Sequence, residues 1–338
     1  MSTGTGTAGP AAGRGSVLAV DAGNSKTDVA VIGADGSVLG TARGGGFQPP
    51  VVGIEAAIDI LAVAIAEAAA AAGLPGLDFA DHVSACLANA DLPVEERELA
   101  EAVQARGWGR TTDVRNDTFA ILRAGLPSGA APRGVAVVCG AGINCVGMLP
   151  DGRTARFPAL GRISGDWGGG SGLAEEALYY GARAEDGRGE PTELVRTLPG
   201  HFGLATMYDL IEALHRGHIP YARRHELAPV LFATSAAGDP VARSLVDRLA
   251  EEVVALSTVA LGKLDLLGEE APVLLGGSVL AARHPQLDDG IAERLAAKAP
   301  KAYVEVVTAP PVLGAALLGL DHVGASAEAH VRLGEHFV

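Results

Sequence analysis

The chain has 338 residues, 48% of them hydrophobic, so it can form two domains of ordinary size with a substantial core, and wholesale disorder is excluded. Its 26 Lys and Arg against 40 Asp and Glu give a net charge of −14, which makes nucleic acid and anionic membrane surfaces poor partners. Its 3 cysteines are too few for a disulfide framework or a four-cysteine metal site, which favours a reduced, cytoplasmic compartment.

The first part of the chain alternates predicted strands with predicted helices. Residues 1–15 are rich in Gly, Ala and Thr and predict a disordered tail. An Ala-rich helix is interrupted by Glu67, so we expect no transmembrane segment there. Strands are expected at 17–20, 28–32, 37–41, 82–88 and 112–116, and helices at 52–72, 94–106 and 117–124.

The pattern begins again near residue 134. A strand, a polar glycine turn, a second strand and an Asp-Gly turn repeat the order of the first forty residues, which predicts an internal duplication of architecture without duplication of sequence. The remainder is expected to be mostly helical up to residue 320, with strands at 134–139, 145–149 and 273–275 and a long helix at 239–264. We expect the last residues, 324–338, to form a loosely held tail.

The stretch "DAGNSKTD" at 21–28 places Asp21 at the end of an apolar strand, directly before a turn of small and polar residues. Backbone N–H groups in such turns can bind phosphate, and a carboxylate can hold Mg²⁺ through water. The alternative is an ordinary hairpin with a solvent-facing Lys–Asp pair.

Two later glycine turns also follow strands. "GAGIN" at 140–144 allows close backbone approach and supplies the Asn144 amide, which can recognise hydroxyl groups. "GGS" at 276–278 precedes a helix, whose N-terminus can hold an anion or ribose hydroxyls. Three such turns, each at a strand end, indicate a nucleotide site.

Together these motifs resemble the superfamily of sugar kinases, actin and heat-shock chaperone ATPases. Within it, the chain is similar to the BadF/BadG/BcrA/BcrD-type ATPases that include N-acetylglucosamine kinases. Their motifs D-G-G-G-T-K-T-D, G-T-G-S-N and G-D-E-G-S are matched by "DAGNSKTD", "GAGIN" and, at 165–169, "GDWGG".

The resemblance implies an α/β, two-lobed actin-like ATPase (ribonuclease H-like) fold with ATP in the interlobe cleft and closure of the lobes on the substrates. The N-terminal lobe would cover 16–127, with a helix near 310–323 packing back on it, and the C-terminal lobe would cover 128–309. It also implies ATP and Mg²⁺ as cofactors, with Asp21 facing the metal. The implied nucleotide-binding residues are Asp21, Gly23, Asn24, Ser25, Lys26, Thr27, Gly140, Ala141, Gly142, Gly276, Gly277 and Ser278.

Asp117, in "VRNDTFA", stands where these kinases place their general base. A sugar hydroxyl must lose its proton as it attacks the γ-phosphorus, and a carboxylate within hydrogen-bond reach can accept that proton. Asp117 could instead interact only with the dipole of the helix that it precedes. The implied substrate-binding residues are Gln48, Asn116, Asp117, Ile143, Asn144, Gly165 and Asp166, although Asp166 could serve turn geometry alone.

The chain departs from the family pattern mostly on the acceptor side. Ala141 replaces a threonine near the phosphates, Trp167 replaces the acidic residue of G-D-E-G-S, and Gln48 stands where N-acetylhexosamine kinases usually carry an asparagine. Phe47 and Trp167 could form a wall against a sugar or cyclitol ring, or could be lid packing.

The function expected is therefore an ATP-dependent kinase of an amino sugar, most simply of N-acetylglucosamine at its 6-hydroxyl. Alternatives are a kinase of glucosamine, N-acetylmuramate or a related polyol or cyclitol, and an ATPase that activates a partner protein. Such activators bridge an iron–sulfur cluster with a cysteine pattern that this chain does not offer. A sugar-sensing regulator would need a DNA-binding module, for which we expect no room. The expected partner is a small-molecule sugar, and a homodimer is compatible with the family.

Overall fold

The computed structural model describes residues 15–337. The chain divides into two compact units, residues 1–131 with 309–338 and residues 132–308. Residues 1–14 of the predicted N-terminal tail lie outside the described residues, and Gly15 already belongs to the first strand.

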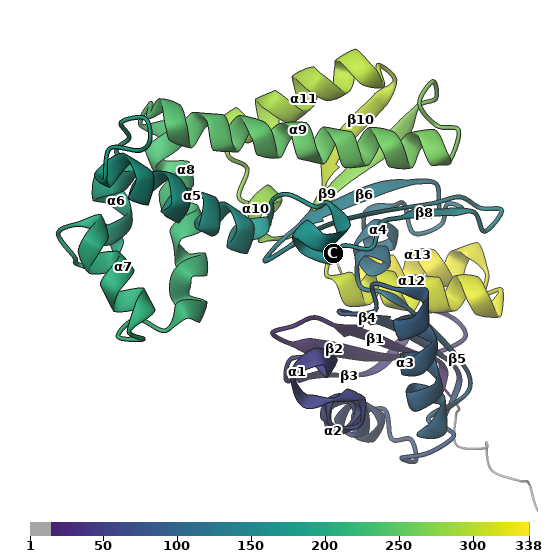
Figure 1. The fold of residues 1–338 in the computed structure, drawn as a ribbon. Coiled ribbons are helices and arrows are strands. Elements are labelled where there is room, and N and C mark those ends of the chain that lie inside the picture. Colours follow the sequence, from purple (N-terminus) through teal and green to yellow (C-terminus); the bar gives the residue numbers. More distant parts are fainter. Residues whose placement is uncertain (1–14, 338) are drawn as a thin grey trace, which may run out of the picture. The chain divides into compact units, whose positions relative to one another are not determined.

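A mixed five-stranded sheet forms the centre of the first unit, in the order β3-β2-β1-β4-β5 (Figure 1). The first three strands form an antiparallel meander, whereas β4 and β5 run parallel to β1. The carboxyl ends of β1, β4 and β5 therefore lie at one edge of the sheet. The bounds are β1 (Gly15–Ala22), β2 (Thr27–Ile32), β3 (Val38–Gly44), β4 (Ala80–Leu87) and β5 (Gly109–Asn116).

Helices cover both faces of this sheet (Figure 1). Leu18 and Val20 point into the core beneath α2 (Ile54–Ala71), while Val17 packs closely against Gly319 of α12 (Pro311–Val323). Every residue of β1 is consequently buried, which explains its nearly continuous apolar run. The other helices of this unit are α1 (Pro49–Val52), α3 (Pro93–Ala105), α4 (Thr118–Gly125) and α13 (Ala327–His336).

The second unit repeats this topology. Its sheet has the order β10-β9-β6-β7-β8, in which β6, β7 and β8 form an antiparallel meander and β9 and β10 run parallel to β6 and to one another. The predicted duplication of architecture is thereby confirmed, although β10 was missing from the prediction. The bounds are β6 (Gly134–Cys139), β7 (Ile143–Met148), β8 (Thr154–Arg156), β9 (Ala271–Gly276) and β10 (Ala302–Val306).

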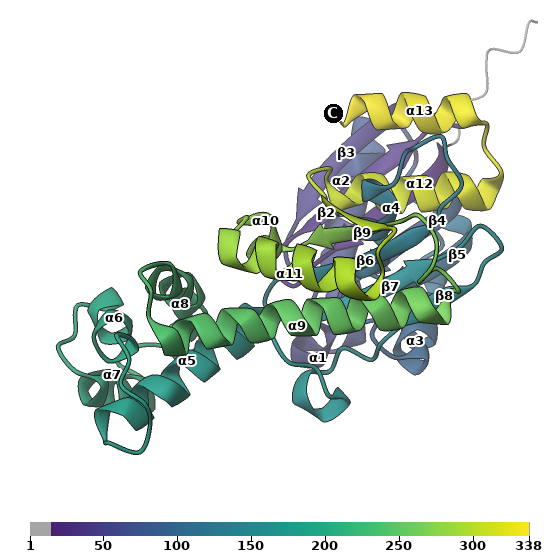
Figure 2. The ribbon, with the colours of Figure 1, turned by 90° about the horizontal axis from the view of Figure 1, so that it is seen from above.

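The long helix α9 (Pro240–Lys263) packs along β6, β7 and β8 (Figure 2). Its first amides are capped by the Asp239 side chain, which accepts from Ala242 N at 2.8 Å.

Four further helices lie beyond the sheet of this unit, and a short and a longer helix follow β9. Within residues 15–337, no helix is long and apolar enough to cross a membrane. The helices are α5 (Gly169–Glu185), α6 (Leu194–His201), α7 (Met207–His215), α8 (Leu227–Ala236), α10 (Ser278–Ala281) and α11 (Pro285–Lys298), with 3₁₀ turns at Gly161–Ser164 and Tyr221–Glu226.

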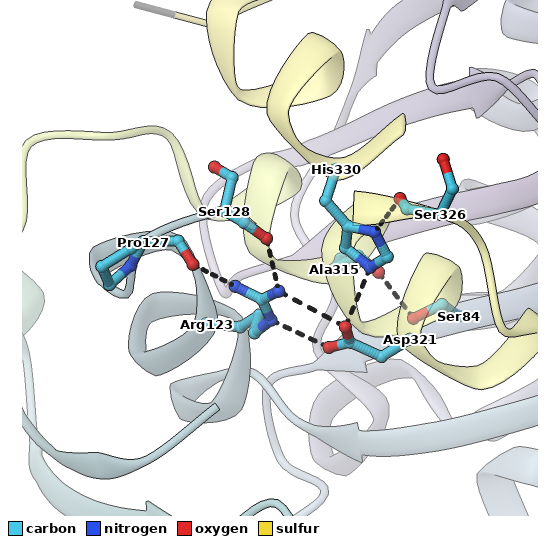
Figure 3. A network of polar contacts seen from close by, with 8 residues as sticks. All are labelled: Ser84, Arg123, Pro127, Ser128, Ala315, Asp321, Ser326 and His330. Atoms are coloured by element: carbon cyan, nitrogen blue, oxygen red, sulfur yellow. Dashed lines mark hydrogen bonds and ion pairs between the residues drawn. The ribbon is translucent and has the colours of Figure 1, made fainter. Parts of the chain in front are cut away.

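The expectation of a loose C-terminal tail is wrong, because residues 327–336 form helix α13. The Ser326 hydroxyl caps this helix by accepting from Ala329 N, and Leu333 is fully buried. His330 places its Nδ1 2.8 Å from the Ser326 carbonyl and its Nε2 2.9 Å from Asp321 Oδ1 (Figure 3). These contacts hold α13 against α12, and the local sequence pattern did not indicate them.

Arg123 is a fully buried arginine at the centre of the same network (Figure 3). Its Nε donates to Asp321 Oδ2 at 2.8 Å, and its other nitrogens donate to the carbonyls of Pro127 and Ser128. This single side chain therefore joins α4, the segment that follows α4, and α12.

Replacing Arg123 with methionine should lower the free energy of unfolding by about 3 kcal/mol, because the carboxylate and two carbonyls lose their buried donor. Arg332→Met is the matched control, since that arginine forms an ion pair with Asp35 in which both side chains are more than half exposed. It should cost less than about 1 kcal/mol. Urea denaturation of the two variants side by side tests this, and equal losses would contradict it.

Candidate functional site

The first group of candidate residues lies at the carboxyl edge of the sheet in the first unit. Asp21 is the last residue but one of strand β1 and pairs with Asp28 of β2 and Cys86 of β4, and only 8% of it is exposed. Burial, followed by the charges of Asp117 and Asp28, raises the pKa of Asp21 to about 8, against an opposing effect of Lys26. A cation bound at this edge would relieve the repulsion among these carboxylates.

Asp117 follows β5 and precedes α4, as predicted. Its amide donates to the Leu87 carbonyl at 3.2 Å, which fixes its backbone beside the end of β4. Burial raises the pKa of the Asp117 carboxyl to about 6, although the Thr118 amide favours the charged form. A carboxyl group with this pKa can accept a proton near neutral pH.

The Asn116 side chain, predicted to bind substrate, is bonded to the scaffold. Its Nδ2 donates to Asp91 Oδ1 at 2.8 Å, and its Oδ1 accepts from Thr118 N at 3.0 Å. Asn116 is 3% exposed. It therefore orients the backbone that carries Asp117 and caps the first turn of α4.

The turn between β1 and β2 contains the predicted Gly23, Asn24, Ser25 and Lys26, and the predicted Thr27 begins β2. A backbone hydrogen bond closes the turn, in which Gly23 N donates to the Lys26 carbonyl at 2.9 Å. Residues 24–26 are exposed. Lys26 Nζ lies 2.9 Å from Asp28 Oδ2, so the Lys–Asp pair of an ordinary hairpin is present. That pair and a phosphate-binding role are compatible, because residues 24–26 of the turn are exposed.

The loop that follows β3 differs from its prediction at Phe47. Phe47 is fully buried in the core beneath the sheet, so it forms neither a wall nor a lid. Pro49 and Pro50 begin the short helix α1, where proline needs no amide donor. Gln48 precedes them, and its Nε2 donates to the Asn24 carbonyl at 2.7 Å.

The second group of candidate residues lies in the second unit. The turn between β6 and β7 consists of Gly140, Ala141 and Gly142, with Gly140 N donating to the Gly142 carbonyl at 3.0 Å. Ile143 and Asn144 were assigned to this turn, but both belong to strand β7. The start of α5 is bonded to the turn, because Gly170 N donates to the Gly140 carbonyl at 2.7 Å.

The third glycine turn, which contains Gly277, lies against the end of strand β6. The φ of Gly277 is +83°, and a Cβ there would lie 2.5 Å from the Cys139 carbonyl, so no other residue fits without displacing β6. Gly276 ends β9 and Ser278 begins α10. The predicted residues of these two turns are thus adjacent to one another in the second unit.

The loop containing Gly165 and Asp166 follows a 3₁₀ turn. Asp166 Oδ2 accepts from Ser164 Oγ at 2.5 Å and from Gly161 N at 3.1 Å, which is the turn-forming role given as the alternative. Trp167 is 7% exposed, and the guanidinium carbon of Arg248 lies 4.3 Å from the centre of its ring. Trp167 therefore packs in the core of this unit and under an arginine of α9.

The sequence prediction omitted three residues that shape these sites: Asn89, Asp91 and Arg248. Asn89 and Asp91 follow β4 and bond to the turn at 23–26 and to Asn116. The polar segment "NAD" after an apolar strand was visible, but its partners lie 65 residues away for Asn89 and 25 residues away for Asp91. No local pattern encodes such contacts.

Two sheets of one topology, each with glycine turns at strand ends, define an actin-like nucleotide-binding α/β protein. The model of the BadF/BadG/BcrA/BcrD ATPase family matches residues 18–319, and the chain belongs to this family. The family assignment and the predicted fold class are thereby confirmed, and ATP is the nucleotide that the family name implies.

Curated relatives include two sugar kinases. The chain is 27% identical over 211 residues to N-acetyl-D-glucosamine kinase of Dictyostelium discoideum, covering 62% of this chain and 65% of that one. It is 24% identical over 193 residues to N-acetylmuramic acid/N-acetylglucosamine kinase of Clostridium acetobutylicum, covering 57% of this chain and 62% of that one. Each match thus spans less than two thirds of the relative.

Solved structures with the same fold cover more of the chain. A Chromobacterium violaceum protein provisionally assigned as an N-acetylglucosamine kinase has a TM-score of 0.69 at 23% identity, covering 92% of this chain and all (100%) of that one. A ROK family glucokinase from Streptomyces griseus, solved with glucose and AMPPNP, has a TM-score of 0.55 at 17% identity. The match covers 91% of this chain and 98% of that one. At these identities the likeness concerns the fold.

Proposed function

We propose that the protein is an ATP-dependent kinase that transfers the γ-phosphate to a hydroxyl of an amino sugar, the 6-hydroxyl of N-acetylglucosamine in the first place. The observation that carries the proposal is a pair of carboxyl groups with raised pKa values, buried Asp21 and half-buried Asp117, at the carboxyl ends of two parallel strands. The names of both curated relatives support the choice of sugar.

The two carboxyl groups would have different tasks. Asp117 would accept the proton of the sugar hydroxyl as its oxygen forms a bond to the γ-phosphorus and the bond to the β-phosphate oxygen breaks, releasing ADP. Asp21 would face Mg²⁺. Within residues 15–337, no group of three or more His, Cys, Asp or Glu side chains is arranged to hold a metal. Phosphate oxygens and water would therefore complete the coordination that Asp21 begins, which is the ligand set Mg²⁺ prefers.

The glycine turns would hold the nucleotide. The turn at 23–27 and Gly140, Ala141 and Gly142 would donate backbone N–H groups to phosphates, and Gly276, Gly277 and Ser278 would lie against the adenosine. Gln48, Asn144, Gly165 and Asp166 would line the sugar. When bound, Mg²⁺ would neutralise charge on the β- and γ-phosphates.

An ATPase that activates a partner through an iron–sulfur cluster is disfavoured by the cysteines. Cys86, Cys139 and Cys145 lie within β4, β6 and β7, and all are buried. Burial raises the pKa of each thiol, so none is poised as an exposed thiolate ligand. Glucosamine, N-acetylmuramate and a polyol or cyclitol remain the alternative acceptors, and a homodimer remains compatible.

A coupled assay of ADP release tests the proposal. N-acetylglucosamine, N-acetylmuramate, glucosamine, glucose and an inositol are each added to protein, Mg²⁺ and ATP. We expect N-acetylglucosamine to give the highest kcat/KM. If no amino sugar raises ADP release above the rate without acceptor, the proposed function is wrong.

A further inference from the structure

Asn89 has an unusual backbone at the candidate site. It follows β4 with a φ of +63°, in the left-handed region that asparagine tolerates better than most residues. The preceding amide, of Ala88, donates to the Ala22 carbonyl at 2.7 Å, so Asn89 stands where the pairing of β4 with β1 ends. Asn89 therefore lies at the same edge of the sheet as Asp21.

The Asn89 side chain joins two loops that are distant in sequence. Its Nδ2 lies 3.0 Å from Asn24 Oδ1, in the turn after β1, and 3.2 Å from the Phe47 carbonyl, in the loop before α1. A primary amide has two N–H groups, so one nitrogen can donate to both oxygens at once. Asn89 thus bonds to a side chain of the turn and to the backbone of the loop.

The two loops are also in direct contact. Phe47 N donates to the Gly23 carbonyl at 2.9 Å, and Thr27 Oγ1 donates to the Gly45 carbonyl at 2.8 Å. A Cβ on Gly46 would lie 2.1 Å from the Asn24 carbonyl oxygen, so the two backbones approach as closely as glycine allows. The turn and the loop are consequently held together by direct hydrogen bonds. Asn89, which follows β4, adds a link that bonds to both of them.

We propose that Asn89 is a positioning residue, which fixes the turn at 23–27 relative to the loop at 45–48 through its side-chain amide. The inference rests on the proposed function, in which the turn binds phosphate and Gln48 of the loop faces the sugar. Asn24 receives two donors, Gln48 Nε2 at its carbonyl and Asn89 Nδ2 at its side chain. A change at Asn89 should therefore alter the binding of both substrates through the turn and the loop.

Asn89→Gly isolates the amide, because glycine adopts the left-handed backbone without strain. Asn89→Ala removes the amide and adds strain, so the comparison of the two separates the two effects. For Asn89→Gly we expect kcat/KM to fall by about 10- to 100-fold, with higher KM for both ATP and sugar, since small misplacements of reacting groups have effects of this size. Its Tm should stay within about 3 °C of the wild type.

Asn24→Ala completes a double-mutant cycle. If Asn89 acts through Asn24, the double variant Asn24→Ala, Asn89→Gly should lose little more activity than the stronger single variant. Binding of AMPPNP by calorimetry gives a readout that needs no sugar, and its Kd should rise in Asn89→Gly.

Three results would overturn the inference: unchanged KM values and AMPPNP affinity in Asn89→Gly, a fall in Tm without a kinetic change, or additive effects of the two substitutions. These outcomes are distinct from failure of the proposed function, which would appear as a wild-type protein that phosphorylates no sugar.

Discussion

Replacing Asp117 with asparagine is expected to lower kcat by about 10²- to 10⁴-fold while leaving ATP affinity nearly unchanged. Asparagine has almost the same shape but cannot accept the proton of the attacking hydroxyl. The measurement is sugar-dependent ADP release, with ATP binding followed by calorimetry on the same preparations. Turnover close to that of the wild type would show that another group is the base.

The control for Asp117→Asn is Asp113→Asn, on the same strand, whose carboxylate pairs with Arg115 at 2.7 Å. It should keep activity within about twofold of the wild type, because an exposed ion pair contributes little. A pH profile gives a second check. Since burial raises the pKa of Asp117 to about 6, kcat/KM of the wild type should fall as the pH drops below that value and the base becomes protonated.

Replacing Asp21 with asparagine should stabilise the protein at pH 8 and abolish its Mg²⁺-dependent turnover. Burial and the charges of Asp117 and Asp28 raise the pKa of Asp21 to about 8 in the folded protein, so the folded state holds this proton more tightly than the unfolded state. The corresponding stability is fully present below the ordinary pKa of an aspartate and is lost as the pH rises toward 8. Removing the charge should therefore add on the order of 1 to 3 kcal/mol at pH 8 and almost nothing at pH 4.

Asp28→Asn is the matched control for the stability measurement. Although burial opposes it, hydrogen bonds from Arg43 and Lys26 lower the pKa of Asp28, so its charge stabilises the folded state at neutral pH. The Asp28 variant should therefore be less stable than the wild type at pH 8, opposite in sign to Asp21→Asn. Thermal unfolding without nucleotide at pH 4 and pH 8 makes the comparison. An Asp21→Asn protein that is less stable at pH 8, or that turns over ATP, would contradict the account.

Most strands of the fold could be predicted because each is a short apolar run bounded by turn residues. The duplication was visible for the same reason, since both halves begin with a strand, a glycine turn and a second strand. Strand β10 was missed because three of its five residues are exposed and because two helices separate it in the sequence from its partner β9. Helix α13 was missed because its docking depends on Asp321 and Arg123, which no local pattern connects to it.

Among the candidate residues of the first unit, Asp21 was located from the strand end before its polar turn, and Asn116 and Asp117 from the resemblance to the family. In the structure these residues lie at the carboxyl ends of parallel strands, which share one edge of the sheet. What each side chain contacts could not be predicted. Phe47 is buried beneath the sheet, whereas the sequence left open a wall against the sugar ring or lid packing. The bonds of Asn89 depend on how two loops approach each other, which is a property of the tertiary fold.

The central claim is most directly tested by identifying the product. Wild-type protein is incubated with ATP, Mg²⁺ and N-acetylglucosamine, and the mixture is followed by ³¹P NMR beside Asp117→Asn. The account predicts one new phosphomonoester signal, split by the two protons of carbon 6, that grows in step with ADP and is absent from the variant. ADP accompanied only by inorganic phosphate would identify a hydrolase and contradict it.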